Sequence, residues 1–388
     1  MTAPVGGHRI RSLTGIRAIA AVTVCLTHAA FWTGGYTDDY VGRLLGRFEV
    51  GVTIFFVLSG YLLFRPWVRS LNEERGTYPR LPRYAWHRVR RIMPAYVITV
   101  AAVYLIFLVR TDASTLGQGW SGFFRNVTLT QVYGVGHLHT GLTQMWSLAA
   151  EVVYYVALPV IAWPLARYVC RDRWRPDLLI VALGGLLIVS PVWTIAVHGG
   201  DVDPTARLWA PAFASWFIAG MLLAVCARLV RSWPAVPSVL IAAAAFLASA
   251  GAFAGEATIV PDDPGAAIVK HGLYLVTAVG LIGPLAVRGG RTAESGHDET
   301  DGSENLWQRF CGSSPMVWLG EISYEFFLVH VMVLELVMDL LDYQVFSGSL
   351  AVAFVVTTAF SIPAAWVLHR VTAPLWRGSH GSDAPSRR

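Results

Sequence analysis

The chain has 388 residues, of which 55% are hydrophobic and only 14% are charged, whereas about a quarter of a soluble domain is charged. Several apolar runs reach the roughly 20 residues that a helix needs to cross a bilayer, and the alternating pattern of a transmembrane barrel is absent. The net charge of +5 does not indicate a nucleic-acid partner, because the cations are nearly all Arg residues beside apolar runs, where they signal topology. The sequence therefore predicts an all-α, polytopic membrane helix bundle.

Ten spans are predicted along the chain, separated by polar loops that contain Gly, Pro and Asp. The first span follows Arg9 and Arg11 and lacks a cleavage site, so we expect it to stay as an anchor. Residues 1–371 are expected to form one membrane domain, and residues 372–388 a short polar cytoplasmic tail. The predicted spans are residues 14–32, 50–66, 92–110, 146–166, 178–198, 208–227, 237–254, 268–287, 316–341 and 348–371.

The distribution of basic residues tests this topology. If both termini are cytoplasmic, 24 of the 30 Lys and Arg residues fall on the inner side and six on the outer side. An excess of Lys and Arg in cytoplasmic segments is what the positive-inside rule expects, so the count favours an even number of spans with both termini inside. Residues 288–309 are polar, and we expect a mobile cytoplasmic loop there.

Four ionisable residues, whose side chains cost free energy within a bilayer, interrupt the apolar spans. Arg17 and His28 lie in the first span, Glu151 in the fourth and His330 in the ninth. An ionisable group within the bilayer is a functional candidate by default, although each one could also only tie helices together. A helical rise of about 1.5 Å per residue puts His28 about 16 Å above Arg17, and puts Glu151 and His330 in the same outer half of the membrane. A His and a carboxylate at similar depth can pair.

The pair His28 and Glu151 is compatible with two kinds of chemistry. The imidazole could act as a general base on a hydroxyl group, with the carboxylate orienting the ring. It could equally serve as a proton relay in a transporter. The spacing of the residues leaves both possibilities open.

Five stretches carry a family resemblance: "RAIAAVTVCLTH", "FFVLSGYLL", "HRVRRIMPAY", "WSLAAEVVYY" and "LGEISYEFFLVH". With these five stretches in this order along the sequence, the chain resembles the acyltransferase-3 family of membrane acyltransferases, which O-acylate sugars and other exported hydroxyl compounds. The resemblance covers nearly the whole chain. His87 departs from it, because many members carry another Arg there. The chain is similar to the minimal form, without a hydrolase-like extracytoplasmic domain.

The resemblance implies an acyl-CoA donor, usually acetyl-CoA, taken from the cytoplasm, and no metal. Arg17, Arg88 and Arg91 are the candidate donor-binding residues, and guanidinium groups do suit phosphate. The separation of Arg17 and His28, about 16 Å by helical rise, resembles the length of a pantetheine arm. We therefore expect Arg17 near the donor's phosphates and His28 near its thioester.

The resulting hypothesis is O-acyl transfer in the cytoplasmic membrane of a bacterium. His28 removes the proton of the acceptor hydroxyl, the alkoxide attacks the thioester carbonyl, and Glu151 orients His28 or stabilises its protonated form. The remaining candidates for binding substrate or the developing oxyanion are Ser59, Tyr61, Trp146, Ser323, Tyr324 and His330.

Two other function classes are kept as alternatives. One is a proton-coupled transporter or flippase of a lipid-linked sugar that uses His28 and Glu151 as a relay, and the other is a receptor or scaffold without chemistry. Binding of acyl-CoA with release of free CoA distinguishes the enzyme from both.

The expected partners are membrane lipids, acyl-CoA and an envelope acceptor, and the oligomeric state is left open. Much Ala, Val, Arg and Gly with one Lys indicates a high-GC genome, such as that of an actinobacterium. The acceptors considered are trehalose mycolates, other envelope glycolipids, arabinogalactan-type polysaccharides and a macrolide. The fold does not choose among these compounds.

Overall fold

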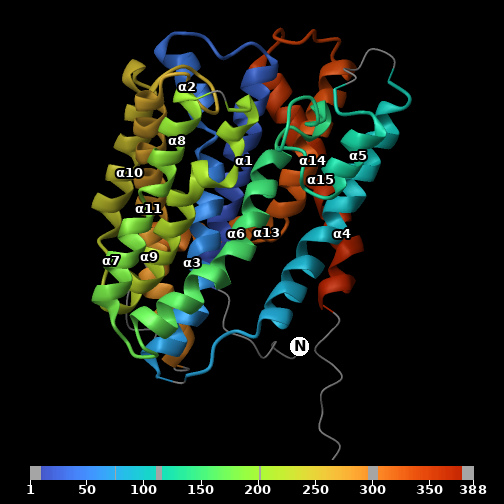
Figure 1. Cartoon of the computed structure of the whole chain (residues 1–388). Helices are drawn as coiled ribbons and strands as arrows, with labels where there is room; N and C mark the ends of the chain where they lie inside the picture. The colour runs from blue at the N-terminus through green and yellow to red at the C-terminus, as the bar shows by residue number, and fades with distance from the viewer. Residues whose placement is uncertain (1–9, 75, 111–115, 201, 296–304, 378–388) are drawn as a thin grey trace, which may run out of the picture.

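The protein is described by a computed structural model that covers residues 10–74, 76–110, 116–200, 202–295 and 305–377. Within these ranges every regular element is a helix, and the long helices stand side by side in one bundle (Figure 1). Eight helical segments are long and apolar enough to cross a membrane, or nine if one bent pair is counted, and α10 is a shorter apolar helix. The predicted all-α membrane bundle is confirmed.

The elements fall into two groups by length. The long or paired ones are α1 (Arg11–Trp32), α3 (Val50–Asn72), α4 (Leu81–Phe107), α6 (Met145–Pro164), α7 (Pro176–Leu186), α8 (Val189–Gly199), α9 (Ala214–Leu229), α10 (Ala235–Ser249), α11 (Pro264–Ser295), α13 (Ser314–Glu321), α14 (Ser323–Leu340) and α15 (Leu350–Arg377). The short ones are α2 (Tyr40–Arg47), α5 (Trp120–Val127), η1 (Thr140–Leu142), η2 (Leu165–Val169), η3 (Pro204–Leu208), η4 (Ala210–Phe213), η5 (Ala252–Ala254) and α12 (Leu306–Gly312).

Each predicted span overlaps a helical segment, but the ends of the later ones differ. The ninth span, predicted as one helix, is broken at Ile322, where α13 and α14 meet at 68°. The prediction of a loop over residues 288–309 is wrong at both ends, because α11 continues to Ser295 and α12 begins at Leu306; residues 296–304 lie outside the described residues. Helix α15 runs on to Arg377, and the rest of the predicted tail is also outside them.

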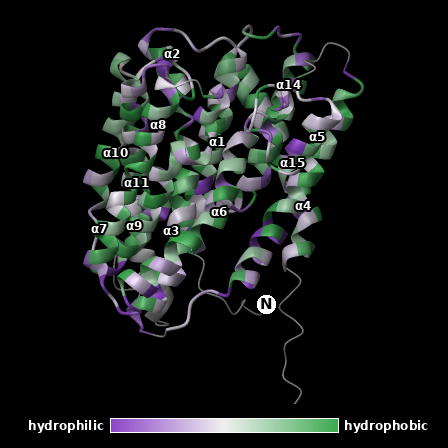
Figure 2. Cartoon of the chain, viewed as in Figure 1, coloured by the Kyte–Doolittle hydropathy of each residue, from purple (hydrophilic) through white to green (hydrophobic). Residues whose placement is uncertain are grey.

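The helices differ in how much of their surface the protein covers. The segment that ends in α9 and the segment that contains α3 are the most buried candidate spans, whereas α7 with α8, and α15, are the least buried. Figure 2 shows apolar residues over the outer helices and hydrophilic residues gathered toward the two ends of the bundle. Helices α3 and α9 therefore form the centre, and the peripheral helices present apolar faces suited to lipid.

Glycines let the central helices touch backbone to backbone. A Cβ atom on Gly220 of α9 would lie 2.1 Å from the carbonyl oxygen of Val57, and one on Gly60 of α3 would lie 2.0 Å from that of Phe217. Helices α1 and α13 meet in the same way, because a Cβ on Gly320 would lie 1.9 Å from the carbonyl oxygen of Thr14. Small residues at such crossings are typical of membrane helix packing.

Substitution of Gly220 by valine is expected to destabilise the protein by about 1–3 kcal/mol, the usual cost of overpacking a well-packed interior. The matched control is Gly272→Ala in α11, where an added Cβ would meet nothing within 4 Å. The thermal midpoints of the two purified variants in the same detergent measure the difference. Equal midpoints would contradict the close α3–α9 contact.

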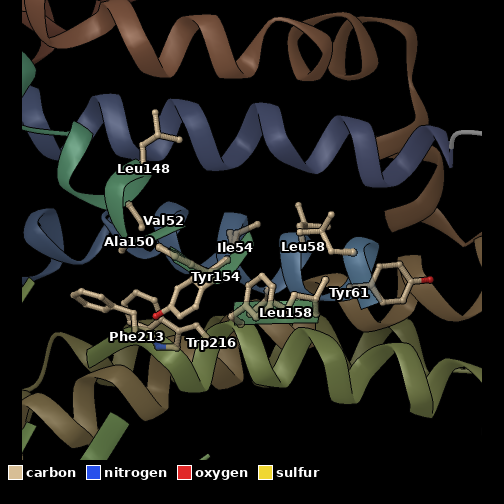
Figure 3. Close-up of a cluster of buried hydrophobic side chains, with 14 of the residues drawn as sticks. Val52, Ile54, Leu58, Tyr61, Leu148, Ala150, Tyr154, Leu158, Phe213 and Trp216 are labelled. Carbon is tan, nitrogen blue, oxygen red and sulfur yellow. The ribbon is translucent and has the colours of Figure 1, made fainter. Parts of the chain in front are cut away.

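An apolar cluster fills the space between α3, α6 and α9 (Figure 3). Leu58 comes from α3, Tyr154 and Leu158 from α6 and Trp216 from α9, and all four are buried. The ring of Tyr154 stacks on that of Phe217 with centroids 4.9 Å apart. This cluster packs α3 against α6, the two helices from which Ser59 and Glu151 of the site described next project.

The six basic residues on the predicted outer side all have partners within the protein. Arg47 is fully buried and donates to the backbone carbonyls of residues 249 and 254–256, and Lys270 pairs with Glu49 at 2.6 Å. Arg110 contacts Glu335 at 2.6 Å. The other three bond as follows: Arg43 to the carbonyl of Ala250, Arg125 to that of Tyr133, and Arg207 to Asp262. These cations have structural roles, so they do not count against the predicted topology.

Candidate active site

A pocket of about 140 Å³ opens between α1, α3, α4, α6 and α14. Seven of the eleven predicted site residues line it: Arg17, Ser59, Arg88, Arg91, Glu151, Ser323 and Tyr324. Apolar side chains from α3, α4, α6 and α14 complete the wall, among them Phe55 and Phe327. The bend at Ile322 begins α14 beside this pocket, which places Ser323 and Tyr324 in its lining.

Glu151 is hydrogen bonded inside this pocket. The hydroxyl of Ser59 on α3 and the hydroxyl of Tyr155 on α6 both donate to Glu151 Oε1, the latter at 2.6 Å. Tyr155 is absent from the residues predicted from the sequence, although it stands four positions after Glu151 and hence on the same helix face. The two hydroxyl groups fix the carboxylate and tie α3 to α6.

Three arginines line the same pocket as Glu151. Arg88 lies with its guanidinium carbon 6.0 Å from the ring centroid of Tyr155, and its Nε is buried without a hydrogen-bond partner. Arg91, one turn further along α4, lies 4.3 Å from the ring of Trp376 and 5.9 Å from that of Tyr324. Arg17 enters the lining from α1. Three guanidinium groups in one lining suit a bound anion such as a phosphate group.

A second buried carboxylate, that of Glu325, contacts Arg91. Glu325 on α14 is only 1% exposed and lies 3.7 Å from Arg91 and 3.1 Å from Nδ1 of His369 on α15. The sequence prediction missed Glu325 and His369, because nothing in the sequence shows that α14 and α15 meet there. Glu325 connects three helices and holds Arg91 toward the pocket.

His28 and His330 form a pair. Nδ1 of His28 on α1 lies 3.0 Å from Nε2 of His330 on α14, and the ring centroids are 5.0 Å apart. His330 is fully buried, and its Nδ1 lies 2.8 Å from the carbonyl oxygen of Phe327. The expected pairing of His28 with Glu151 is wrong in this structure: His28 bonds to His330, whereas Glu151 bonds to Ser59 and Tyr155.

The pocket and the histidine pair share Phe327. Its side chain lines the pocket, its ring centroid lies 5.7 Å from that of His330, and its carbonyl oxygen contacts the His330 ring. Phe55, also in the pocket wall, makes an edge contact with Phe327 at 6.2 Å between centroids. The histidine pair therefore lies one aromatic layer away from the arginine-rich pocket.

The other predicted residues already have partners. Tyr61 is buried and donates to the carbonyl of Ala286 at 3.1 Å, and Trp146 packs on Phe213 with centroids 4.9 Å apart. The hydroxyls of Ser323 and Tyr324 donate to the carbonyls of Gly320 and Ile92, each at 2.9 Å. Among the described residues, no group of three or more His, Cys, Asp or Glu side chains is placed to hold a metal ion.

Comparison with known proteins identifies the family. A family model described as "Acyltransferase domain" matches residues 10–370. The chain belongs to this acyltransferase family. The prediction made from the five motifs is thereby confirmed, and the matched range contains all the pocket residues and both histidines.

Several curated proteins are similar to this acyltransferase-family chain. The "Peptidoglycan O-acetyltransferase OatA" of Listeria monocytogenes is 29% identical over 243 residues, which are 59% of this chain and 36% of OatA. The "Acyltransferase MdmB" of Streptomyces mycarofaciens is 27% identical over 349 residues, 84% of this chain and 79% of MdmB. "Nodulation protein 10" of Rhizobium leguminosarum is 26% identical and covers about half of each chain. No solved structure matches.

The relatives differ in length from this acyltransferase-family chain. It spans about a third of the length of OatA but most of the length of MdmB. On this chain the matched family range, residues 10–370, runs from α1 through most of α15.

Proposed function

We propose that this protein is an O-acyltransferase of a bacterial cytoplasmic membrane. It moves an acyl group, of which acetyl is the first to test, from cytoplasmic acyl-CoA to a hydroxyl of an envelope glycolipid, polysaccharide or other sugar-containing compound. The observation that carries the proposal is the histidine pair one aromatic layer away from a pocket lined by three arginines. A base next to an anion site is what acyl transfer from a phosphate-bearing thioester requires.

The donor is proposed to bind with its phosphates against Arg17, Arg88 and Arg91. Helix α4 begins, and α15 ends, at the lower end of the bundle in Figure 1, and Arg90 of α4 bonds to the carbonyl of Leu375 near the end of α15. The positive-inside bias assigns this end to the cytoplasm, where acyl-CoA is found. The buried Nε of Arg88, which lacks a partner, is a donor that an incoming phosphate oxygen would satisfy.

In the proposed reaction His28 accepts the proton of the acceptor hydroxyl. The resulting alkoxide attacks the thioester carbonyl, the carbon–sulfur bond breaks, and the thiolate takes the proton back from His28 as CoA leaves. Glu151 contributes from within the pocket: it keeps the Ser59 and Tyr155 hydroxyls in place and offsets part of the positive charge of the arginines in the lining. Direct contact between His28 and Glu151 has no part in this scheme.

Replacement of Arg88 by alanine is expected to raise the KM for acetyl-CoA about 10- to 100-fold, since a hydrogen bond to a charged group contributes about 1.5–3 kcal/mol. Arg90→Ala is the matched control, because Arg90 stands on the same helix but is not in the pocket lining. Equilibrium binding of a non-hydrolysable acetyl-CoA analogue gives the same comparison without turnover. Equal losses in the two variants would mean that the arginines act by general surface charge.

The acceptor class is tested by comparing envelope glycolipids and glycans of a deletion strain with those of the parent by mass spectrometry. The proposal expects one class of compound to lose the mass of an acyl group, and to regain it on complementation. An unchanged acylation pattern, together with purified protein that neither binds acetyl-CoA nor releases CoA, would contradict the proposal and favour a transporter.

A further inference from the structure

The contacts of His330 define where the protons of the histidine pair lie. Its Nδ1 faces the carbonyl oxygen of Phe327 at 2.8 Å and that of Phe326 at 3.3 Å. A carbonyl oxygen only accepts, so Nδ1 of His330 carries the hydrogen. In a neutral imidazole the other nitrogen then has only a lone pair, so Nε2 of His330 accepts a hydrogen bond.

The hydrogen that Nε2 of His330 accepts comes from Nδ1 of His28, 3.0 Å away. His28 therefore carries its own hydrogen on Nδ1 and presents the lone pair on Nε2. The opposite arrangement would put the lone pair of His330 Nδ1 against the lone pairs of the Phe327 carbonyl at 2.8 Å, which is repulsive. Among arrangements of two neutral rings, this one satisfies the contacts of His330, and the ring of His28 also hydrogen bonds to the backbone of Val24.

We infer that His330 is a positioning residue that fixes the tautomer of His28, so that Nε2 of His28 is the basic nitrogen of the reaction. The inference rests on the proposed function, in which His28 is the general base. When Nε2 of His28 takes the proton of the hydroxyl, Nδ1 keeps its hydrogen and continues to donate to His330, and Nε2 later releases the same proton to the departing thiolate.

The surroundings of His330 keep its ring in one orientation. The ring lies parallel to that of Phe326, with an interplanar angle of 4° and centroids 5.9 Å apart, and it is fully buried. The side-chain amide of Gln144 donates to the carbonyl of Leu328 at 2.9 Å, which holds the turn of α14 that supplies the Phe327 carbonyl. A ring packed in this way does not flip freely to exchange its two nitrogens.

His330 stands behind His28 as the third member of a catalytic triad stands behind its histidine, but His330 is neutral where that member is charged. In a serine protease the group behind the histidine is a carboxylate, and its replacement by an amide lowers turnover by about 10⁴-fold because the histidine adopts the wrong tautomer. Here the orienting groups are a neutral imidazole and a peptide carbonyl. We therefore expect a smaller effect, on the order of 10- to 100-fold, because only the tautomer and not the charge of the protonated base is supported.

Two substitutions separate positioning from packing. In His330→Gln the amide oxygen reaches the place of Nε2 and can accept from His28, whereas in His330→Asn the shorter amide reaches only the Phe327 carbonyl. With acetyl-CoA and the glycolipid extract of the deletion strain, we expect kcat of the Gln variant to stay within about threefold of the unmodified protein, and kcat of the Asn variant to fall about 10- to 100-fold. The KM for acetyl-CoA and the thermal midpoint should be similar in the two variants.

The tautomer itself is read from the ¹⁵N spectrum of histidine-labelled protein, with the His28 signals assigned by their loss in His28→Asn. We expect the hydrogen of His28 on Nδ1 in the unmodified protein and in His330→Gln, and a shift of it toward Nε2 in His330→Asn. A hydrogen on Nε2 in the unmodified protein, or equal kcat in the two His330 variants, would overturn the inference. Full activity of His28→Ala would instead refute the proposed base, whatever the spectrum shows.

Discussion

Replacing His28 with alanine is expected to lower acyl transfer by a factor on the order of 10²–10⁴, the usual contribution of a positioned general base. In the proposed reaction no other group in the histidine pair can replace it, because the lone pair of His330 Nε2 is directed at His28 and its Nδ1 at a peptide carbonyl. Release of free CoA per folded protein, measured with acetyl-CoA and the glycolipid extract, gives the rate. Binding of acetyl-CoA should change little, since His28 is not in the lining of the pocket.

The matched control for this variant is His198→Ala. His198 is also a histidine that bonds to backbone carbonyls, those of Thr194 and Pro261, but it lies in α8 at the periphery of the bundle. Its loss is expected to reduce stability and to leave the rate per folded molecule unchanged. If the two variants lost activity in proportion to folded protein alone, His28 would be a structural residue.

Replacing Glu151 with glutamine is expected to lower turnover on the order of 10²–10³-fold, comparable with the removal of one preorganised electrostatic group. The amide retains the shape of the side chain but removes the one carboxylate that the described residues place in the pocket lining, beside Arg17, Arg88 and Arg91. It also forces one of the two hydroxyls that now donate to Oε1 to change partner. Turnover and the thermal midpoint of the purified variant measure the two consequences separately.

Glu335→Gln is the control for Glu151. Glu335 is likewise a buried glutamate on a membrane helix, but it pairs with Arg110 at 2.6 Å on the predicted outer side and is absent from the pocket lining. We expect a loss of stability without a specific loss of turnover. Equal turnover in the two Glu variants would show that the pocket charge does not matter for the reaction.

The sequence predicts which residues belong to the candidate site better than it predicts which of them contact one another. Costly residues within apolar runs identify Arg17, His28 and Glu151, because such residues are rare in lipid and persist where they have a function. Helical rise also puts His28 and His330 at a similar depth, and the structure pairs them. Depth does not give the direction in which a side chain leaves its helix, so depth alone also allows His28 to pair with Glu151.

Contacts between helices that are distant in the sequence account for the other differences between the predicted site and the site in the structure. Tyr155 was within reach of sequence reasoning, since it is one helical turn from Glu151. Glu325 and His369 were not, because their meeting depends on how α14 packs against α15. The bend at Ile322 lies two residues after Gly320, which meets the backbone at Thr14 in a tertiary contact that hydropathy does not register.

The central claim is that a cytoplasmic thioester is attacked under base catalysis by His28, and one measurement tests it most directly. Purified protein in proteoliposomes that contain the glycolipid extract of the deletion strain is given radiolabelled acetyl-CoA, and label in lipid and free CoA are counted for the unmodified protein and for His28→Ala. The account predicts equal amounts of acylated lipid and CoA with the unmodified protein, and both reduced by a factor on the order of 10²–10⁴ with the variant, although the variant still binds acetyl-CoA. Transfer of label by the variant at the unmodified rate would contradict it.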